Sequence, residues 1–463
     1  MATATLPNVS TNDTGVLGLM QTADAAQKVS ELLKADMERH HVFFNDRGFH
    51  NHIPHHLLTI YALGGTPEEV QKAYGNDVHM QQPSRPVDET KVAQLSDKGN
   101  FKALIGNGNN YPHFLAFFQR QIDAKGIGAV LNEYVFAGDD VADDMFVRLY
   151  GGLVHPFIHL GFGVEFNQPA IVAEALAQTA VHEALYRPFL VPAEQAAGGI
   201  GKEGKESLVQ LQKEIRSNDK LRSSIRWDDD NKIFDGVMAR APEEMIKIAS
   251  QFSVGPDQIE EKLAELLNAI VYFAGTSQRP DKRIKFDFFL LHCVTSAIFL
   301  RSFISQPWLS TQNKLRILEW KGRMDLLQCA ARGCLEPRPE DITHYKPSLS
   351  WEKIFSKAIN HPGDDGHVVK LIRSLAYGEK LCKPFEEEEK YKEAFPIRGD
   401  MWVKLANMGE CYPGFKQKVP DSSFGSRGLL STWLNHPCLS YMNEGITLLL
   451  LLDVSPSLKS LPA

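Results

Sequence analysis

The sequence has few of the features that mark secreted, membrane-embedded or nucleic-acid-binding proteins. Its 463 residues include only six cysteines, scattered without the paired spacing of zinc or disulfide modules, which favours a reduced, intracellular protein. Lysine and arginine number 50 against 57 acidic residues, so no basic surface for nucleic acid is expected. The longest apolar run, Ile446–Leu452, is too short to span a bilayer, and the first residues lack the charged and apolar regions of a signal peptide. We therefore expect a cytoplasmic protein with no membrane span and no nucleic-acid partner.

Motifs for nucleotides and flavins are missing as well. The segment Gly199–Glu206 resembles a phosphate-binding loop, but Glu206 stands where Ser or Thr is required and no strand precedes it. No Gly-x-Gly-x-x-Gly follows a strand pattern, which argues against a Rossmann-bound flavin. The His-Glu-x-x-His pattern of zinc proteases is absent too.

Helical patterns dominate the chain, with few alternating strand patterns and no internal repeat. Since 43% of the residues are hydrophobic, the chain can bury a large core. We predict a mostly α protein, either a large single helical domain or two fused helical lobes, around a buried metal pocket. Residues 1–24 are expected to be a flexible lead and 25–408 the catalytic domain, with 187–232 as a lid or insertion and 409–463 as a divergent tail.

The most informative stretch is Asn45–Leu63, where four of the 16 histidines fall within seven residues. Histidine is a common metal ligand, so the cluster indicates one wall of a buried metal site. Pro54 suits the first turn of a helix that continues to Ala62 and stops at the following glycines. His55 and His56 then lie about 100° apart around the helix, so one of them is expected to face the core. The alternative is a polar helix start whose histidines are structural.

Two further segments contribute histidines in apolar surroundings. His155 and His159 are four residues apart, which places both on one helical face, about 6 Å from each other. Glycines around this pair suit a place where backbone approaches a ligand closely. His292 stands alone in an apolar helical pattern, and for it a satisfied core histidine is the alternative.

His367 and Lys370 share one face of a helix that Asp364 or Asp365 would cap. Because Leu371 lies on the same face, we expect Lys370 to be buried, and burial lowers the pKa of a lysine and favours the neutral amine. A neutral amine can take up CO2 as a carbamate, which turns a cation into an anionic oxygen ligand. The alternative is a surface lysine whose stem covers apolar neighbours.

Three motifs, in this order along the chain, resemble the questin oxidase-like family of fungal polyketide pathways: Phe49–Leu58, Gly152–Gly163 and Asp364–Lys370. The likeness extends over about residues 25–408. It implies an enzyme that opens anthraquinone rings oxidatively, in a Baeyer–Villiger-like outcome, with NADPH dependence assigned to some members. The chain also looks like a related dioxygenase of beticolin biosynthesis, a non-haem iron enzyme with four histidine ligands and a carboxylated lysine. After Met408 the family usually continues as another helix, whereas this chain turns into the divergent tail.

Carried over by motif, the resemblance makes Lys370 the carboxylated lysine and His367 an iron ligand, and both are predicted to be catalytic. The remaining ligands would come from the histidine-rich stretch, the second pair and His292. The predicted metal-binding set is His55, His56, His155, His159, His292, His367 and Lys370. The residues predicted to bind substrate are His52, Phe49, Phe157, Phe162 and Phe289. The cofactors implied are Fe(II)/Fe(III) with the Lys370 carbamate, and NADPH as in some members; the partners are O2 and an aromatic polyketide.

Three other functions are compatible with these residues. A metal-free, NADPH-using Baeyer–Villiger oxidase would keep its activity after chelation. A helical, non-enzymatic pathway protein would contain no metal. A metal-dependent hydrolase could also use a carboxylated lysine, but such sites usually need aspartate ligands, and Asp364 and Asp365 are better explained as helix caps.

Overall fold

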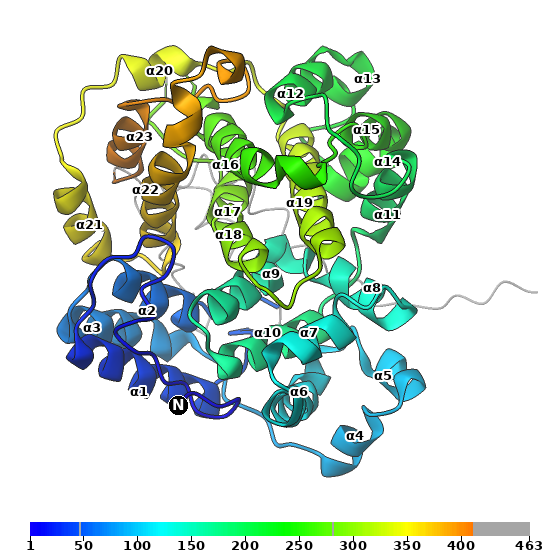
Figure 1. The fold of residues 1–463 in the computed structure, drawn as a ribbon, viewed down its shortest axis with the longest axis vertical. Coiled ribbons are helices and arrows are strands. Elements are labelled where there is room, and N and C mark those ends of the chain that lie inside the picture. Colours follow the sequence, from blue (N-terminus) through cyan, green and yellow to red (C-terminus); the bar gives the residue numbers. More distant parts are fainter. Residues whose placement is uncertain (46–47, 280–281, 411–463) are drawn as a thin grey trace, which may run out of the picture.

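The computed structural model describes residues 1–45, 48–279 and 282–410 (Figure 1). Within these ranges the chain is helical, and extended backbone pairs only in isolated bridges such as that between Phe43 and His50. The predicted mostly α class is therefore confirmed, and the helices share one hydrophobic core. Residues 411–463, which hold most of the predicted tail, lie outside the described part of the chain.

The first part of the chain lies in the lower half of Figure 1 and carries the histidine-rich segments. Its helices are α1 (Ala23–Arg39), α2 (Ile53–Ala62), α3 (Pro67–Asp77), α4 (Glu89–Gln94), α5 (Lys98–Leu104), α6 (Tyr111–Lys125), α7 (Ile127–Tyr134), α8 (Asp140–Arg148), α9 (Gly151–Glu165) and α10 (Pro169–Val181). Two single turns, η1 (Val78–Met80) and η2 (Gly108–Asn110), belong to the same part.

The second part contributes the long helices that close the core. They are α11 (Arg187–Ala196), α12 (Leu208–Ser217), α13 (Asp219–Arg222), α14 (Met238–Arg240), α15 (Pro242–Ala249), α16 (Ile259–Thr276), α17 (Phe288–Ala297), α18 (Phe299–Ile304), α19 (Thr311–Ala331), α20 (Pro339–Thr343), α21 (Trp351–Ile359), α22 (His367–Glu386) and α23 (Met401–Glu410). Short turns η3 (Lys232–Val237), η4 (Pro256–Gln258) and η5 (Glu389–Tyr391) connect them. None of the helices within the described ranges has both the length and the apolar character that crossing a bilayer requires.

Two segments that the sequence analysis treated as peripheral lie against this core. Residues 1–22 precede α1 without forming a helix, and the N–H of Asn8 donates to the side chain of Gln168. Residues 187–232 form α11, α12 and α13, and the N–H of Leu208 donates to a buried glutamate of α16.

Four helices from distant parts of the chain surround the histidines. Helix α2 packs against α9 and α22, and α17 packs against the same two helices. Figure 1 shows this meeting of early and late segments near the centre of the molecule, with α2 in blue, α9 in teal, α17 in green and α22 in gold. The fold therefore brings four sequence motifs to one place.

Candidate metal centre

Each of the four central helices contributes one histidine to a common cluster. The ring nitrogens of His52, His155 and His367 that could bind a metal all lie within 4.8 Å of one another. The fourth ring, that of His292, lies with its Nε2 atom 3.2 Å from Nε2 of His367. We call His52, His155, His292 and His367 the four-histidine centre.

His52 is held in place by the start of α2. The residue before it, Asn51, is buried, and its side-chain oxygen accepts the N–H of Ile53 at 2.9 Å. The amide group of Asn51 in turn donates to both carboxylate oxygens of Asp36 in α1, at 3.0 and 2.9 Å. The turn that precedes α2 is therefore tied to α1, and it fixes the direction of the His52 ring.

His155 follows an unusual stretch of backbone inside α9. Gly152, Leu153 and Val154 have φ values of 50°, 56° and 60°, the left-handed region that side chains rarely adopt. Gly152 is also required by space, because a Cβ atom there would lie 2.7 Å from Cε1 of His50. The stretch turns the carbonyl of Gly152 toward His155, whose Nδ1 lies 2.6 Å from it.

His292 and His367 are oriented by different means. In α17 the Nδ1 of His292 donates to the carbonyl of Phe288, one turn earlier, at 2.7 Å. His367 begins α22, and its Nδ1 lies 2.6 Å from a carboxylate oxygen of Asp365. The other oxygen of Asp365 lies 3.4 Å from Nδ1 of His52, so one carboxylate contacts two rings of the centre.

The hydrogen bonds of the four rings determine where their lone pairs point. A backbone carbonyl can only accept, so His155 and His292 must carry a proton on Nδ1, and a carboxylate favours the same tautomer in His52 and His367. The Nε2 atoms then carry no proton, yet Nε2 of His52 lies only 2.9 Å from Nε2 of His155. Facing lone pairs repel each other, and a cation between them converts that repulsion into coordination. The centre therefore fits a metal ion.

Burial keeps His52, His155 and His292 neutral, as metal binding requires. Desolvation lowers the pKa of His52 to about 3 and holds those of His155 and His292 well below the usual range. Burial alone would raise the pKa of Asp365, but the charge and hydrogen bond of His367, together with the contact to His52, hold it well below the usual range. The result is three rings that burial keeps neutral, beside one carboxylate anion.

Lys370 lies one turn after His367 on α22 and is buried, with 3% of its surface exposed. Its Nζ atom is buried and has no hydrogen-bond partner among the described residues. Desolvation lowers the pKa of this amine to about 8, partly offset by the nearby charges of Asp365 and Asp364. A buried amine without a partner is costly as a cation, and it is suited to conversion into a neutral or anionic derivative.

The predicted ligands His55 and His159 meet each other one turn away from the four-histidine centre. Nε2 of His55 lies 3.1 Å from Nδ1 of His159, and Nε2 of His159 lies 3.4 Å from the carboxylate of Glu174 in α10. The remaining predicted ligand, His56, forms a pair with Asp77 at 2.8 Å. The structure thus separates the histidines of each motif and gives them different partners.

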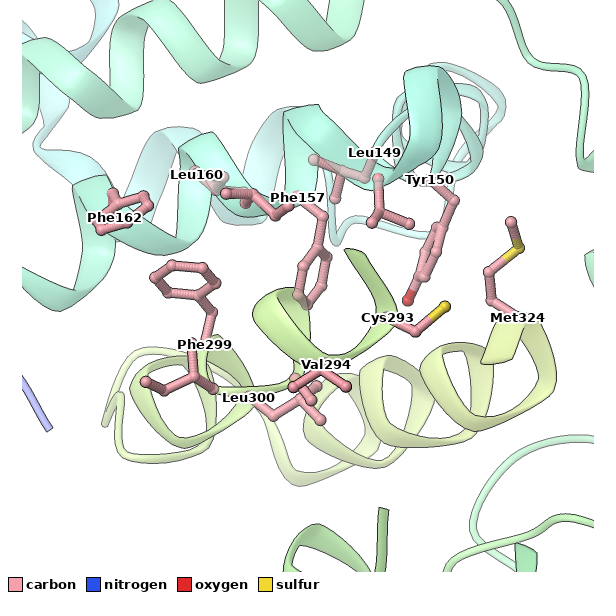
Figure 2. Close-up of a cluster of buried hydrophobic side chains, with 14 of the residues drawn as sticks. Leu149, Tyr150, Phe157, Leu160, Phe162, Cys293, Val294, Phe299, Leu300 and Met324 are labelled. Carbon is pink, nitrogen blue, oxygen red and sulfur yellow. The ribbon is translucent and has the colours of Figure 1, made fainter. Parts of the chain in front are cut away.

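The aromatic residues predicted to bind substrate lie in several environments. Phe157 and Phe162 are fully buried, and Figure 2 shows their rings directed from α9 toward the α17–α18 segment, where Phe162 faces Phe299. Phe49 packs on Phe44, and Phe289 lies under the guanidinium of Arg332. Among the described phenylalanines, Phe288 contacts the centre: it is partly exposed and lies 4.4 Å from the His292 ring and 5.3 Å from the His367 ring between centroids.

Sequence reasoning missed a further pair of rings beside the centre. The His50 ring stacks on His155 at 4.0 Å, and its Nε2 lies 2.7 Å from Nε2 of His182 at the end of α10. His50 belongs to the histidine-rich motif and could have been included on that basis. His182 follows a helix pattern with no other sign of function, so no local signal marked it.

Comparison with known proteins places these motifs in a family. The family model described as Questin oxidase-like matches residues 49–375. The chain is 45% identical over 388 residues to a Baeyer–Villiger oxidase of Pestalotiopsis fici, covering 82% of this chain and 87% of that protein. It is 38% identical over 405 residues to a questin oxidase of Aspergillus fumigatus, covering 85% and 91%. It is also 38% identical over 422 residues to a Baeyer–Villiger monooxygenase of a Cryptosporiopsis species, covering 88% and 94%.

Proposed function

Because the chain belongs to the questin oxidase-like family and is an oxidoreductase, we propose that it is a non-haem iron oxygenase that cleaves a C–C bond of an anthraquinone-type polyketide ring. Its role would lie in the secondary metabolism of a fungus, as the organisms of its relatives suggest. The observation that carries the metal assignment is the convergence of four unprotonated Nε2 atoms from four segments of the chain. Imidazole suits iron, zinc, copper and nickel alike; zinc has no redox chemistry, and we choose iron because the motifs resemble those of a non-haem iron enzyme.

The proposed ligands are the four histidines of the centre together with a carbamate on Lys370. His52, which the sequence predicted to bind substrate, is a metal ligand in this proposal. The proposal leaves His55, His56 and His159 outside the coordination sphere. Carbamate formation joins Nζ of neutral Lys370 to the carbon of CO2 and releases one proton, so that a neutral buried amine becomes an anionic oxygen ligand. Once bound, iron would supply the O2 chemistry that the protein side chains lack.

The chain's own residues would orient and shield the reacting groups. Phe288 offers a partly exposed aromatic face beside the centre, on which a flat polycyclic substrate can stack. The burial of His155 and His292 excludes water from the inner side of the centre. Four free, buried cysteines among the described residues are compatible with the reducing cytoplasm, where we propose that the protein acts.

The test is turnover of an anthraquinone or anthraquinol by protein loaded with Fe(II) without oxygen and then exposed to O2. We expect ring-opened product from iron-loaded protein, no product after removal of iron, and recovery when Fe(II) is added back but not when Zn(II) is added. Full activity in the iron-free protein would contradict the proposal.

A second candidate is a metal-free Baeyer–Villiger oxidase that consumes NADPH, and the naming of one relative as a monooxygenase favours it. A monooxygenase inserts one oxygen atom and reduces the other to water with two electrons from NADPH. This reaction predicts one NADPH oxidised per product and activity that persists in the presence of a chelator. A dioxygenase would incorporate both atoms of labelled O2 without that reductant.

A further inference from the structure

We infer that Asp365 is the positioning residue of the four-histidine centre, a single carboxylate that orients two of its rings at once. The inference rests on the proposed function, since it concerns the geometry of the same metal site. Asp365 lies in the turn that leads into α22, and neither its oxygens nor its position is needed to cap that helix. One oxygen lies 2.6 Å from Nδ1 of His367 and the other lies 3.4 Å from Nδ1 of His52.

The pairing requires two acceptors on one side chain, and an ionised carboxylate supplies them. Each imidazole presents an N–H on its Nδ1 side, and each oxygen of Asp365 faces one of these donors. An asparagine has one oxygen and one NH2 group, so it can accept a hydrogen bond from one ring, while its NH2 group faces the N–H donor of the other ring. Asp365→Asn therefore keeps nearly the same side-chain shape but retains only one of the two oxygen acceptors.

The arrangement divides the centre into two unlike halves. His155 and His292 donate to the backbone carbonyls of Gly152 and Phe288, which are neutral acceptors. His52 and His367 share the anion. Since a carboxylate partner raises the basicity of an imidazole and fixes its tautomer, His52 and His367 should be the stronger donors to the metal.

The neighbouring Asp364 provides a matched control. Its carboxylate accepts the N–H groups of Val368 at 2.9 Å and Val369 at 3.1 Å, so it caps α22. Asparagine keeps one of these two acceptors, so Asp364→Asn removes the same negative charge and one capping hydrogen bond from the same turn without touching a ring of the centre. Any effect of Asp365→Asn that Asp364→Asn lacks belongs to the ring contacts and not to net charge.

The first experiment titrates metal-free wild type, Asp365→Asn and Asp364→Asn with Co(II), whose visible spectrum reports the ligand field. We expect Asp365→Asn to bind Co(II) about 10- to 100-fold more weakly than wild type, the range typical for partners of metal-bound histidine, with an altered spectrum. Asp364→Asn is expected to keep the wild-type spectrum, and the melting temperatures of both variants should stay close to that of wild type. Equal affinity and identical spectra in Asp365→Asn and wild type would overturn the inference while leaving the proposed function intact.

The second experiment needs no metal and so separates the two proposals. Imidazole 15N–1H correlation spectra of the metal-free protein, assigned with His52→Phe and His367→Phe, report which ring nitrogen carries the proton. We expect the Nδ1–H tautomer for both rings in wild type and its loss from one of them in Asp365→Asn. Unchanged tautomers in Asp365→Asn would overturn the positioning role, whatever metal the protein binds. Absence of any Co(II) or Fe(II) binding by wild type would overturn both proposals together.

Discussion

Two pairs of histidines connect α2 and α9, and they differ in what lies beyond them. In the first pair, His52 meets His155 at 2.9 Å, and the outer nitrogens face Asp365 and the carbonyl of Gly152. In the second, one turn further along both helices, His55 meets His159 at 3.1 Å. We call His52 and His155 the outer pair, and His55 and His159 the inner pair.

The partner of the second ring nitrogen decides whether a buried histidine can bind a metal. In the outer pair each Nδ1 has its own acceptor, so both Nε2 lone pairs remain for a cation. In the inner pair Glu174 accepts from Nε2 of His159, whose Nδ1 is then free to accept from His55. The facing nitrogens of the two rings thereby satisfy each other without a metal, while Nδ1 of His55 is buried and has no hydrogen-bond partner among the described residues.

The largest expected effect comes from removing one ring of each pair in turn. His155→Ala should abolish iron retention and lower turnover by more than roughly 100-fold, beyond the range typical for indirect partners of a metal. His159→Ala should retain iron close to wild type. Iron content and single-turnover product, measured side by side, check the difference, and equal loss of iron in both variants would show that the pairs do not differ as described.

A substitution of Lys370, in α22, tests whether this lysine contributes a metal ligand beside the outer pair. Lys370→Ala should lose iron and turnover with little effect on folding, because its amine makes no hydrogen bond within the described residues. The matched control is Lys380→Ala, an exposed lysine on the same helix, which should retain both. Normal iron content in Lys370→Ala would eliminate its role as a ligand.

Much of the scaffold could be predicted from the sequence because local signals were strong. Thr66 and Pro67 begin α3 with the expected cap. The structure also brings together His155, His292 and His367, three residues that the sequence had singled out. The choice among neighbouring histidines could not be predicted, since it depends on which helices pack against α2 and α9 and on where acceptors lie.

The roles of the two aspartates show the same limit. The sequence allowed Asp364 or Asp365 to cap α22; in the structure Gly366 occupies the N-cap position, and Asp364 supplies the carboxylate that accepts from the first turn. Asp365 instead faces His52, a residue more than 300 positions earlier, a contact that no local pattern encodes. The motifs could be identified from the sequence, but only the tertiary contacts distinguish a carboxylate that caps a helix from one that contacts two rings of the four-histidine centre.

Acid should destabilise the metal-free protein through both pairs. Burial lowers the pKa of His52 to about 3 and holds that of His55 well below the usual range, whereas in the unfolded chain both titrate near 6.5. Below that pH the unfolded state binds more protons than the folded state, so stability present above pH 6.5 is lost as pH falls toward 3. At pH 5 the loss is about 2 kcal/mol for each such histidine. Urea unfolding at pH 7 and pH 5 measures it, and a flat profile would contradict neutral rings.

A smaller effect is expected from the inner pair alone. His159→Ala leaves the buried Glu174 without its hydrogen-bond partner, which should lower the free energy of unfolding by about 1–3 kcal/mol. The double variant with Glu174→Gln should recover part of that loss, since a neutral amide costs less to bury than a carboxylate. A double variant no more stable than His159→Ala would argue against this reading of the inner pair.

The most direct test of the metal assignment is the elemental composition of the native protein, purified without added metal or chelator. We predict one iron per chain, bound by the Nε2 atoms of the outer pair, His292 and His367. Iron should be reduced to a trace in His155→Ala and retained in His159→Ala. Fully active wild-type protein that contains no iron would contradict the account.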